Sequence, residues 1–156
     1  MQNARLKAIE QYQNGEVISR FTDMYAIDQK EAVDLFQETK KFLYISPIEG
    51  VFIPDDLLIL DEMWHNFILF TAVYHEFCKR FFDNKFLHHL PASKKEKESH
   101  IRLLTEQPEL AREEYLRKME KLVSIVYDHL GEKTVKKWFQ IYPKKYSKEN
   151  IKALRK

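Results

Sequence analysis

Asp61 and His65 form a pair whose residue types and spacing suit chemistry. They stand four positions apart, and in a helix that spacing places both side chains on one face, one turn apart. A carboxylate in this position can hold the imidazole in one tautomer and raise its basicity, or the two side chains can ligate one metal ion. The pair can also form a buried polar network that only fixes a nearby loop. The spacing leaves these three alternatives open.

His88 and His89 add two more imidazoles a short way along the chain. Together with Asp61 and His65 they would make a competent ligand set for zinc, iron or manganese. Neighbouring histidines in an extended connector point to opposite sides, so we expect at most one of them to reach His65.

The return path of the chain limits this contact. If one straight helix continued to Phe82, His65 would lie about 25 Å below its end. The residues from Phe82 to His89 span only about 20–25 Å when extended. Contact therefore requires a nearly straight return, a helix that ends early, or a ligand from another segment such as His129.

The composition favours helices as the elements that position these side chains. The 156 residues include only three glycines and five prolines, and few chain breakers favour helix over a turn-rich β fold. We expect an all-α fold, a single compact domain over residues 1–156 with about five to seven helices around a long central helix. That helix should cover about residues 55–82 and bury Leu58, Trp64, Ile68 and Phe77 or their neighbours. The tail at about 147–156 adds a last helical turn or frays.

Helix boundaries are marked at several positions. Asp28, with Glu31 three residues later, predicts a capping box. Pro108 is well placed in the first turn of a helix that runs from Glu109 to about Leu130, and Gly131 should end it.

Other residues of the central segment have structural explanations beside chemical ones. Trp64 is typical of a core anchor, and Cys78 of a small buried hydrophobe, although Lys79 and Arg80 would lower the thiol pKa if it were exposed. Thr71 and Tyr74 could line a pocket or simply pack.

Charge, cysteine content and hydrophobic runs narrow the expected classes of partner and location. With 26 basic and 24 acidic residues the net charge is only +2, which by itself does not indicate nucleic acid. One cysteine cannot make an internal disulfide, and neither a signal peptide nor a membrane span is evident, so we expect a cytoplasmic protein. The basic and aromatic segment 136–146 is the one candidate nucleic-acid surface.

The central segment carries a recognisable motif: Asp61-x-x-Trp64-His65-x-x-Ile68-x-x-Thr71-x-x-Tyr74-x-x-Phe77-Cys78, followed by His88-His89-x-Pro91. This motif resembles the glycine-rich domain-containing protein-like family, best over residues 57–91 and more loosely over 127–143. The chain departs from that family in having no glycine-rich tail, and Asp83-Asn84 replaces a glycine before the histidines. The resemblance implies a shared motif and motif positions at Trp64, Thr71, Tyr74, Cys78 and Pro91, but it brings no established reaction.

Three functions follow as hypotheses. The first is a divalent-metal protein, enzymatic or not, that uses Asp61, His65 and one of His88 and His89. The second is a non-catalytic domain for protein partners, in which the motif is a buried structural network. The third is a nucleic-acid binder through residues 136–146. A small molecule is a further candidate ligand for the first.

Overall fold

The chain folds into helices joined by short connections. The computed structural model describes the backbone of residues 2–156 and the side chains of residues 4–156, so Met1 lies outside the description. In chain order the elements are α1 (Gln2–Gln11), α2 (Gly15–Met24), α3 (Gln29–Ile45), a 3-10 turn (Asp55–Leu57), α4 (Leu58–Ile68), α5 (Thr71–Phe81), α6 (Lys94–Glu106), α7 (Pro108–Leu130), α8 (Glu132–Lys136), a π-helical turn (Lys137–Ile141), α9 (Tyr142–Lys145) and α10 (Lys148–Leu154). No strand occurs in the described part of the chain, which confirms the all-α expectation. The helices are shorter and more numerous than the five to seven that we expected.

Local sequence signals account for several helix ends. The Asp28 carboxylate accepts a hydrogen bond from the Glu31 N–H at 2.7 Å and caps α3, as its type and position predict. Pro108 occupies the first turn of α7, where its missing N–H costs nothing. Gly131 ends α7 with a φ of 91°, a conformation that residues with a Cβ rarely adopt.

The long central helix expected over residues 55–82 is wrong, because the chain breaks into α4 and α5 at Leu69 and Phe70. The break brings residues ten positions apart into contact. The rings of Phe67 and Phe77 lie 5.1 Å apart, whereas ten residues of straight helix would separate them by about 15 Å. Burial of both rings in one core stabilises the fold enough to offset the helical hydrogen bonds lost at the break. Neither glycine nor proline marks this position in the sequence. The longest helix is α7 instead.

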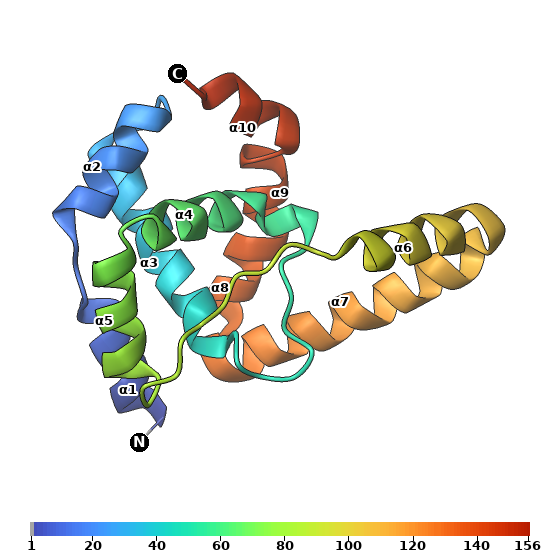
Figure 1. The fold of residues 1–156 in the computed structure, drawn as a ribbon, viewed down its shortest axis with the longest axis horizontal. Coiled ribbons are helices and arrows are strands. Elements are labelled where there is room, and N and C mark those ends of the chain that lie inside the picture. The colour runs from blue at the N-terminus through green and yellow to red at the C-terminus, as the bar shows by residue number, and fades with distance from the viewer. Residues whose placement is uncertain (1) are drawn as a thin grey trace.

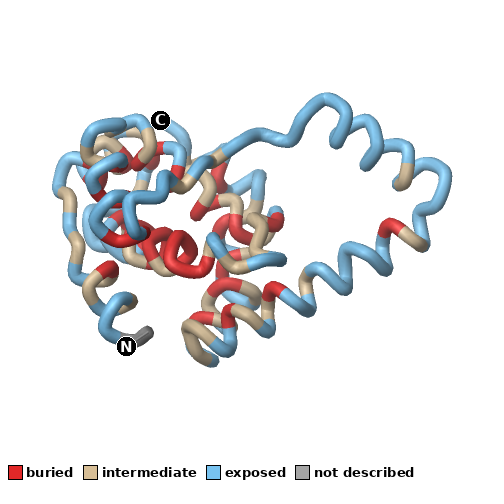
Figure 2. Tube along the Cα trace, turned by 60° about the horizontal axis from the view of Figure 1, so that its bottom comes forward, coloured by how far each residue is buried: buried red, intermediate tan, exposed pale blue. Residues whose placement is uncertain are grey.

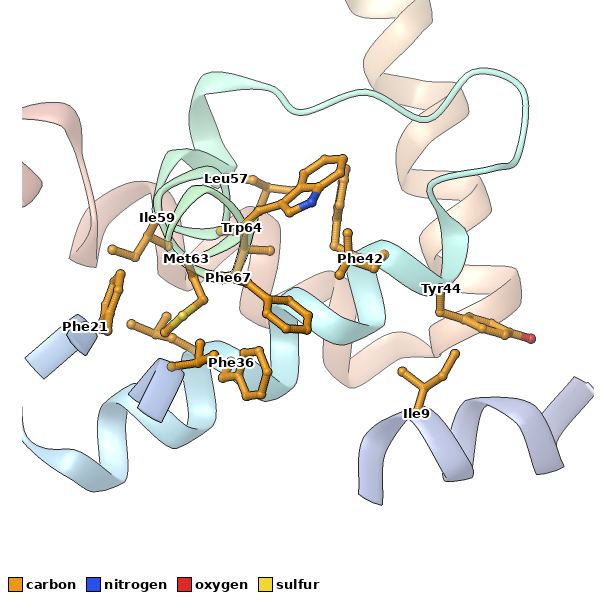
Figure 3. Packing of buried hydrophobic residues seen from close by; sticks show 14 of the residues in the cluster. Ile9, Phe21, Phe36, Phe42, Tyr44, Leu57, Ile59, Met63, Trp64 and Phe67 are labelled. Atoms are coloured by element: carbon orange, nitrogen blue, oxygen red, sulfur yellow. The ribbon is translucent and has the colours of Figure 1, made fainter. Parts of the chain in front are cut away.

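The core forms around α4, which lies in the middle of the body of the molecule (Figure 1). Its side chains Met63, Trp64 and Phe67 turn toward Phe36 and Phe42 of α3 (Figure 3). The Phe36 and Phe67 rings meet edge to face at 5.1 Å, a preferred aromatic geometry. Of the four residues expected to be buried, Trp64 and Phe77 are buried, and Leu58 and Ile68 are only half-buried.

The last residues are ordered against α2. Ile151 of α10 is buried, and the Ala26 N–H donates to the Leu154 carbonyl at 2.7 Å. The Lys156 N–H donates to the Met24 carbonyl at 2.9 Å. The last residues thus form a helical element, α10, that contacts the end of α2 through these backbone hydrogen bonds.

Two helices project away from this body. α6 and the first half of α7 pack side by side as an antiparallel hairpin (Figure 1). We call residues 94–121 the arm. No residue of α6 is buried, and the arm is exposed along most of its length (Figure 2). The second half of α7 returns to the body, where Leu122 and Val126 are buried. Within residues 2–156 no helix has the length and apolar composition needed to cross a membrane.

Candidate metal centre

Three side chains of the motif converge at the surface of α4. His65 Nδ1 lies 3.5 Å from Asp61 Oδ2, and His89 Nε2 lies 2.7 Å from Asp61 Oδ1. One ligand atom from each of Asp61, His65 and His89 falls within 4.8 Å of the other two. The Asp61 carboxylate thus contacts both imidazoles, whose ring centroids lie 4.4 Å apart.

The break between α4 and α5 makes this convergence feasible. Because α5 does not continue the axis of α4, His65 is not a full helix length below the point where the connector begins. The reversal itself falls on Asp83 and Asn84, with φ angles of 52° and 64°. Both residues therefore adopt the left-handed conformation, for which Asn and Asp are the best suited residues after glycine. The connector then runs back past α4 to His89.

Two contacts fix the connector once it returns. The Tyr74 hydroxyl donates to the Leu87 carbonyl at 2.6 Å, and it accepts a hydrogen bond from the Trp64 indole N–H at 3.0 Å. The imidazole of His89 stacks on the indole of Trp64, with ring centroids 4.1 Å apart and planes inclined by 20°. Trp64 and Tyr74 therefore position His89. This function is more specific than the core anchor expected for Trp64 and the pocket lining or packing expected for Tyr74.

The remaining motif residues lie outside the group. The His88 ring lies 4.8 Å from the Phe86 ring, and of the two neighbouring histidines His89 is the one that belongs to the group. Cys78 is buried, and burial raises the pKa of its thiol. Thr71 is an exposed residue in the first turn of α5, and Pro91 is exposed on the connector. His129 lies in the last turn of α7 and is not part of the group.

The site is partly open to solvent. The side chains of Asp61 and His89 are 19% and 15% exposed, whereas that of His65 is 55% exposed. An ion held by these three residues would therefore have protein on one side and solvent on the other. This arrangement leaves coordination positions free, as catalytic metal sites do.

The group opens into a cleft of about 1230 Å³. The loop of Val51, Phe52 and Ile53 and the connector from Phe86 to Ala92 both line it. The base of the arm contributes Glu96 and Lys118 to the lining, and the Lys118 ammonium lies 4.5 Å from the Phe52 ring. Mixed apolar and polar walls of this kind are typical of sites that bind organic molecules.

The sequence of the chain was compared with known protein families. The family described as UCP032817-like matches residues 4–102. The chain belongs to the UCP032817-like family. The matched region of this UCP032817-like protein includes Asp61, His65 and His89 and ends inside α6. No curated protein and no solved structure matches the chain.

The cleft walls of this UCP032817-like protein were missed by sequence reasoning. The apolar residues of "SPIEGVFIPDD" indicated an ordered loop, but nothing in the sequence indicated that this loop lines one cleft together with the histidine connector. Lys118 was missed because a lysine on an exposed helix face has no distinguishing pattern.

The C-terminal aromatic residues do not support nucleic-acid binding. Trp138, Tyr142 and Tyr146 are buried, and the Trp138 indole N–H donates to the Glu38 carboxylate at 2.7 Å. Base stacking needs exposed aromatic faces. Segment 136–146 is therefore a core element with lysines on its outer side.

Proposed function

We propose that Asp61, His65 and His89 bind one divalent metal ion and present it to a molecule held in the cleft. The observation that carries this proposal is the convergence of three ligand-type atoms within 4.8 Å on the wall of a cleft of about 1230 Å³. Bound to a metal, such atoms lie about 2.0–2.2 Å from the ion. Small side-chain rotations of His65 would close the remaining gap, because that side chain is the most exposed of the three.

Two histidines and one carboxylate suit several metals. Zinc in such a set keeps a water in its fourth position, and iron(II) in a set of two histidines and one carboxylate leaves positions for substrate and oxygen. The carboxylate offsets one of the two positive charges. The identity of the bound metal would therefore decide whether the site carries out hydrolytic chemistry, as with zinc, or redox chemistry, as with iron. We further propose that the motif from Asp61 to Pro91 is shared with the glycine-rich domain-containing protein-like family.

One observation favours a second function, a purely structural network. The His89–Asp61 distance of 2.7 Å is already that of a good hydrogen bond, and the stack on Trp64 is in place as well. In this alternative the three side chains only fix the connector to α4, and the cleft or another surface binds a protein or small-molecule partner.

Metal analysis of protein purified without a histidine tag distinguishes the two. The wild type should carry about one metal ion per chain or take one up from zinc, manganese or anaerobic iron(II) solutions. The key variant is His65→Ala, because the half-exposed side chain contributes little to folding and its loss should act on the metal alone. The matched controls are His88→Ala, beside the site, and His100→Ala, on exposed α6.

The expected result is loss of bound metal in His65→Ala and retention in both controls. Metal at 100 times its Kd should raise the free energy of unfolding of the wild type by about 2.7 kcal/mol, and a chelator should remove that gain. A wild type that binds none of the three metals, with a thermal midpoint indifferent to chelator, would overturn the metal proposal and leave the structural network. Equal metal loss in His88→Ala would also contradict the ligand assignment.

A further inference from the structure

The arm exposes apolar side chains that the body of the molecule does not cover. Ile101 and Leu104 of α6 are 61% and 49% exposed, and Leu116 of α7 is 50% exposed. Ile101 and Leu104 stand three positions apart, so they lie on one face of α6. Leu103, between them in sequence, is only partly exposed and Ala111 of α7 is buried, as expected where α6 and α7 pack on each other. A two-helix hairpin with apolar residues on its outer face can gain stability by covering that face.

The charges of the arm are separated along its length. At the tip, residues 106–109 contain two glutamates and no basic residue, for a net charge of −2. At the base, residues 94–98 and 117–121 contain six lysines or arginines and three glutamates, for a net charge of +3. α6 has 13 residues, so tip and base are about 20 Å apart. This separation exceeds the Debye length of about 8 Å at physiological salt. A partner would therefore meet two distinct regions of opposite sign.

We propose that this surface binds a second copy of the chain, with the two arms packed antiparallel about a twofold axis. In that arrangement the acidic tip of each arm lies against the basic base of the other, and the outer apolar side chains face each other between them. The twofold axis satisfies both charge contacts with one surface, as isologous dimers require. A parallel arrangement would set tip against tip and base against base, and like charges oppose it.

The size of the surface sets the expected strength. Two helices about 10 Å apart and about 20 Å long offer a face of roughly 400 Å² per copy. The two copies together would bury about 800 Å², which is less than standard specific interfaces bury and is the size of a weak, transient contact. We therefore expect a reversible dimer with a Kd on the order of micromolar. This inference does not depend on metal binding at Asp61, His65 and His89.

Sedimentation velocity over a range of micromolar concentrations tests the apolar contact. The wild type should shift from monomer to dimer, and the Ile101→Glu/Leu104→Glu variant should remain a monomer. The matched control is Leu69→Glu, since Leu69 is 61% exposed at the break between α4 and α5, away from the arm. The control should dimerise like the wild type. Circular dichroism of all three checks that each is folded, which we expect because the substituted side chains are exposed.

A charge exchange tests the antiparallel geometry. In Glu106→Lys/Glu109→Lys the tip becomes positive, and in Lys94→Glu/Lys97→Glu the base becomes negative. Each variant alone then brings like charges together and should be monomeric. A mixture of the two should form a heterodimer, because each tip again meets a base of opposite sign. A wild type that is monomeric throughout, a Leu69→Glu control that dissociates, or a mixture that fails to associate would each overturn the proposal.

Discussion

The Trp64 indole N–H and the Tyr74 hydroxyl are joined by a hydrogen bond of 3.0 Å across the break between α4 and α5. The Tyr74 hydroxyl in turn donates a hydrogen bond to the Leu87 carbonyl at 2.6 Å. Two residues before His89, the connector is thus tied to both helices at once. The phenol is well buried, and burial raises its pKa above the ordinary range, so it remains a neutral donor.

Replacing Tyr74 with Phe should destabilise the protein and release His89. The change leaves the Trp64 N–H and the Leu87 carbonyl without their partner, which should cost about 1–3 kcal/mol in chemical denaturation. The NMR signals of the His89 ring, shifted upfield by stacking on Trp64, should move toward ordinary values. If metal binds, its affinity should fall as well.

Tyr142→Phe is the matched control for this experiment. The Tyr142 hydroxyl is also buried, but within residues 4–156 it has no hydrogen-bond partner. Its removal should therefore be neutral or slightly stabilising, because no bond is lost. Equal destabilisation by the two substitutions would contradict the function assigned to Tyr74.

The reversal at Asn84 should tolerate glycine and reject branched residues. Asn84 has a φ of 64°, which glycine adopts without a Cβ penalty. We expect Asn84→Gly to leave the free energy of unfolding nearly unchanged and Asn84→Val to lower it by about 1–2 kcal/mol. Urea denaturation measures both, and similar midpoints for the two variants would show that the connector does not depend on this turn.

Lys40 should make stability depend on pH in the alkaline range. Its side chain is buried, its ammonium donates to the Glu10 carbonyl at 2.8 Å and to the Tyr12 carbonyl, and Phe36 lies beneath it. Burial lowers the pKa of Lys40 from 10.5 to about 8, against the opposing charge of Glu10. Between these two values the unfolded chain binds more protons than the folded protein, so stability due to this residue rises with pH.

The comparison that isolates this effect is wild type against Lys40→Met. The free energy of unfolding of the wild type, relative to that of the variant, should increase as the pH rises from about 8 toward 10.5. The difference between them cancels the ionisation of the buried tyrosines, which both proteins share. A difference that stays constant with pH would show that the Lys40 pKa is not lowered.

Cys78 should be inert in the folded protein. It is 1% exposed, and burial raises the pKa of its thiol, so the reactive thiolate is scarce and inaccessible. Thiol titration should be slow under native conditions and fast in denaturant. Rapid stoichiometric labelling of the native protein would restore the nucleophile hypothesis.

The sequence allowed the helical class and several helix ends to be predicted, because those signals are local. Asp28, Pro108 and Gly131 act through their own backbone or that of near neighbours. The break at Leu69 and Phe70 could not be predicted in this way. No local residue disfavours helix there, and the break is stabilised by contacts such as that between Phe67 and Phe77, which depend on the folded core.

In the candidate site, too, the local features could be predicted from the sequence and the long-range contacts could not. The Asp61–His65 pair follows from helix periodicity, and the limit of one connector histidine follows from the geometry of an extended chain. The choice of His89 over His88 depends on the stack with Trp64 and on the tie through Tyr74. Those contacts exist only after α5 has folded back. An estimate based on one straight helix therefore overstated the distance that the connector must span to reach His65.

The candidate ligands come from both sides of α5, and this has a consequence for cooperativity. An ion held by His65 and His89 would act as a cross-link that closes a chain loop of 24 residues, with the whole of α5 inside it. By the loop-entropy relation for disulfides, such a closure is worth about 3.5 kcal/mol through the unfolded chain alone. The amides of α5 would then exchange with solvent only when the ion leaves or the loop opens as a unit.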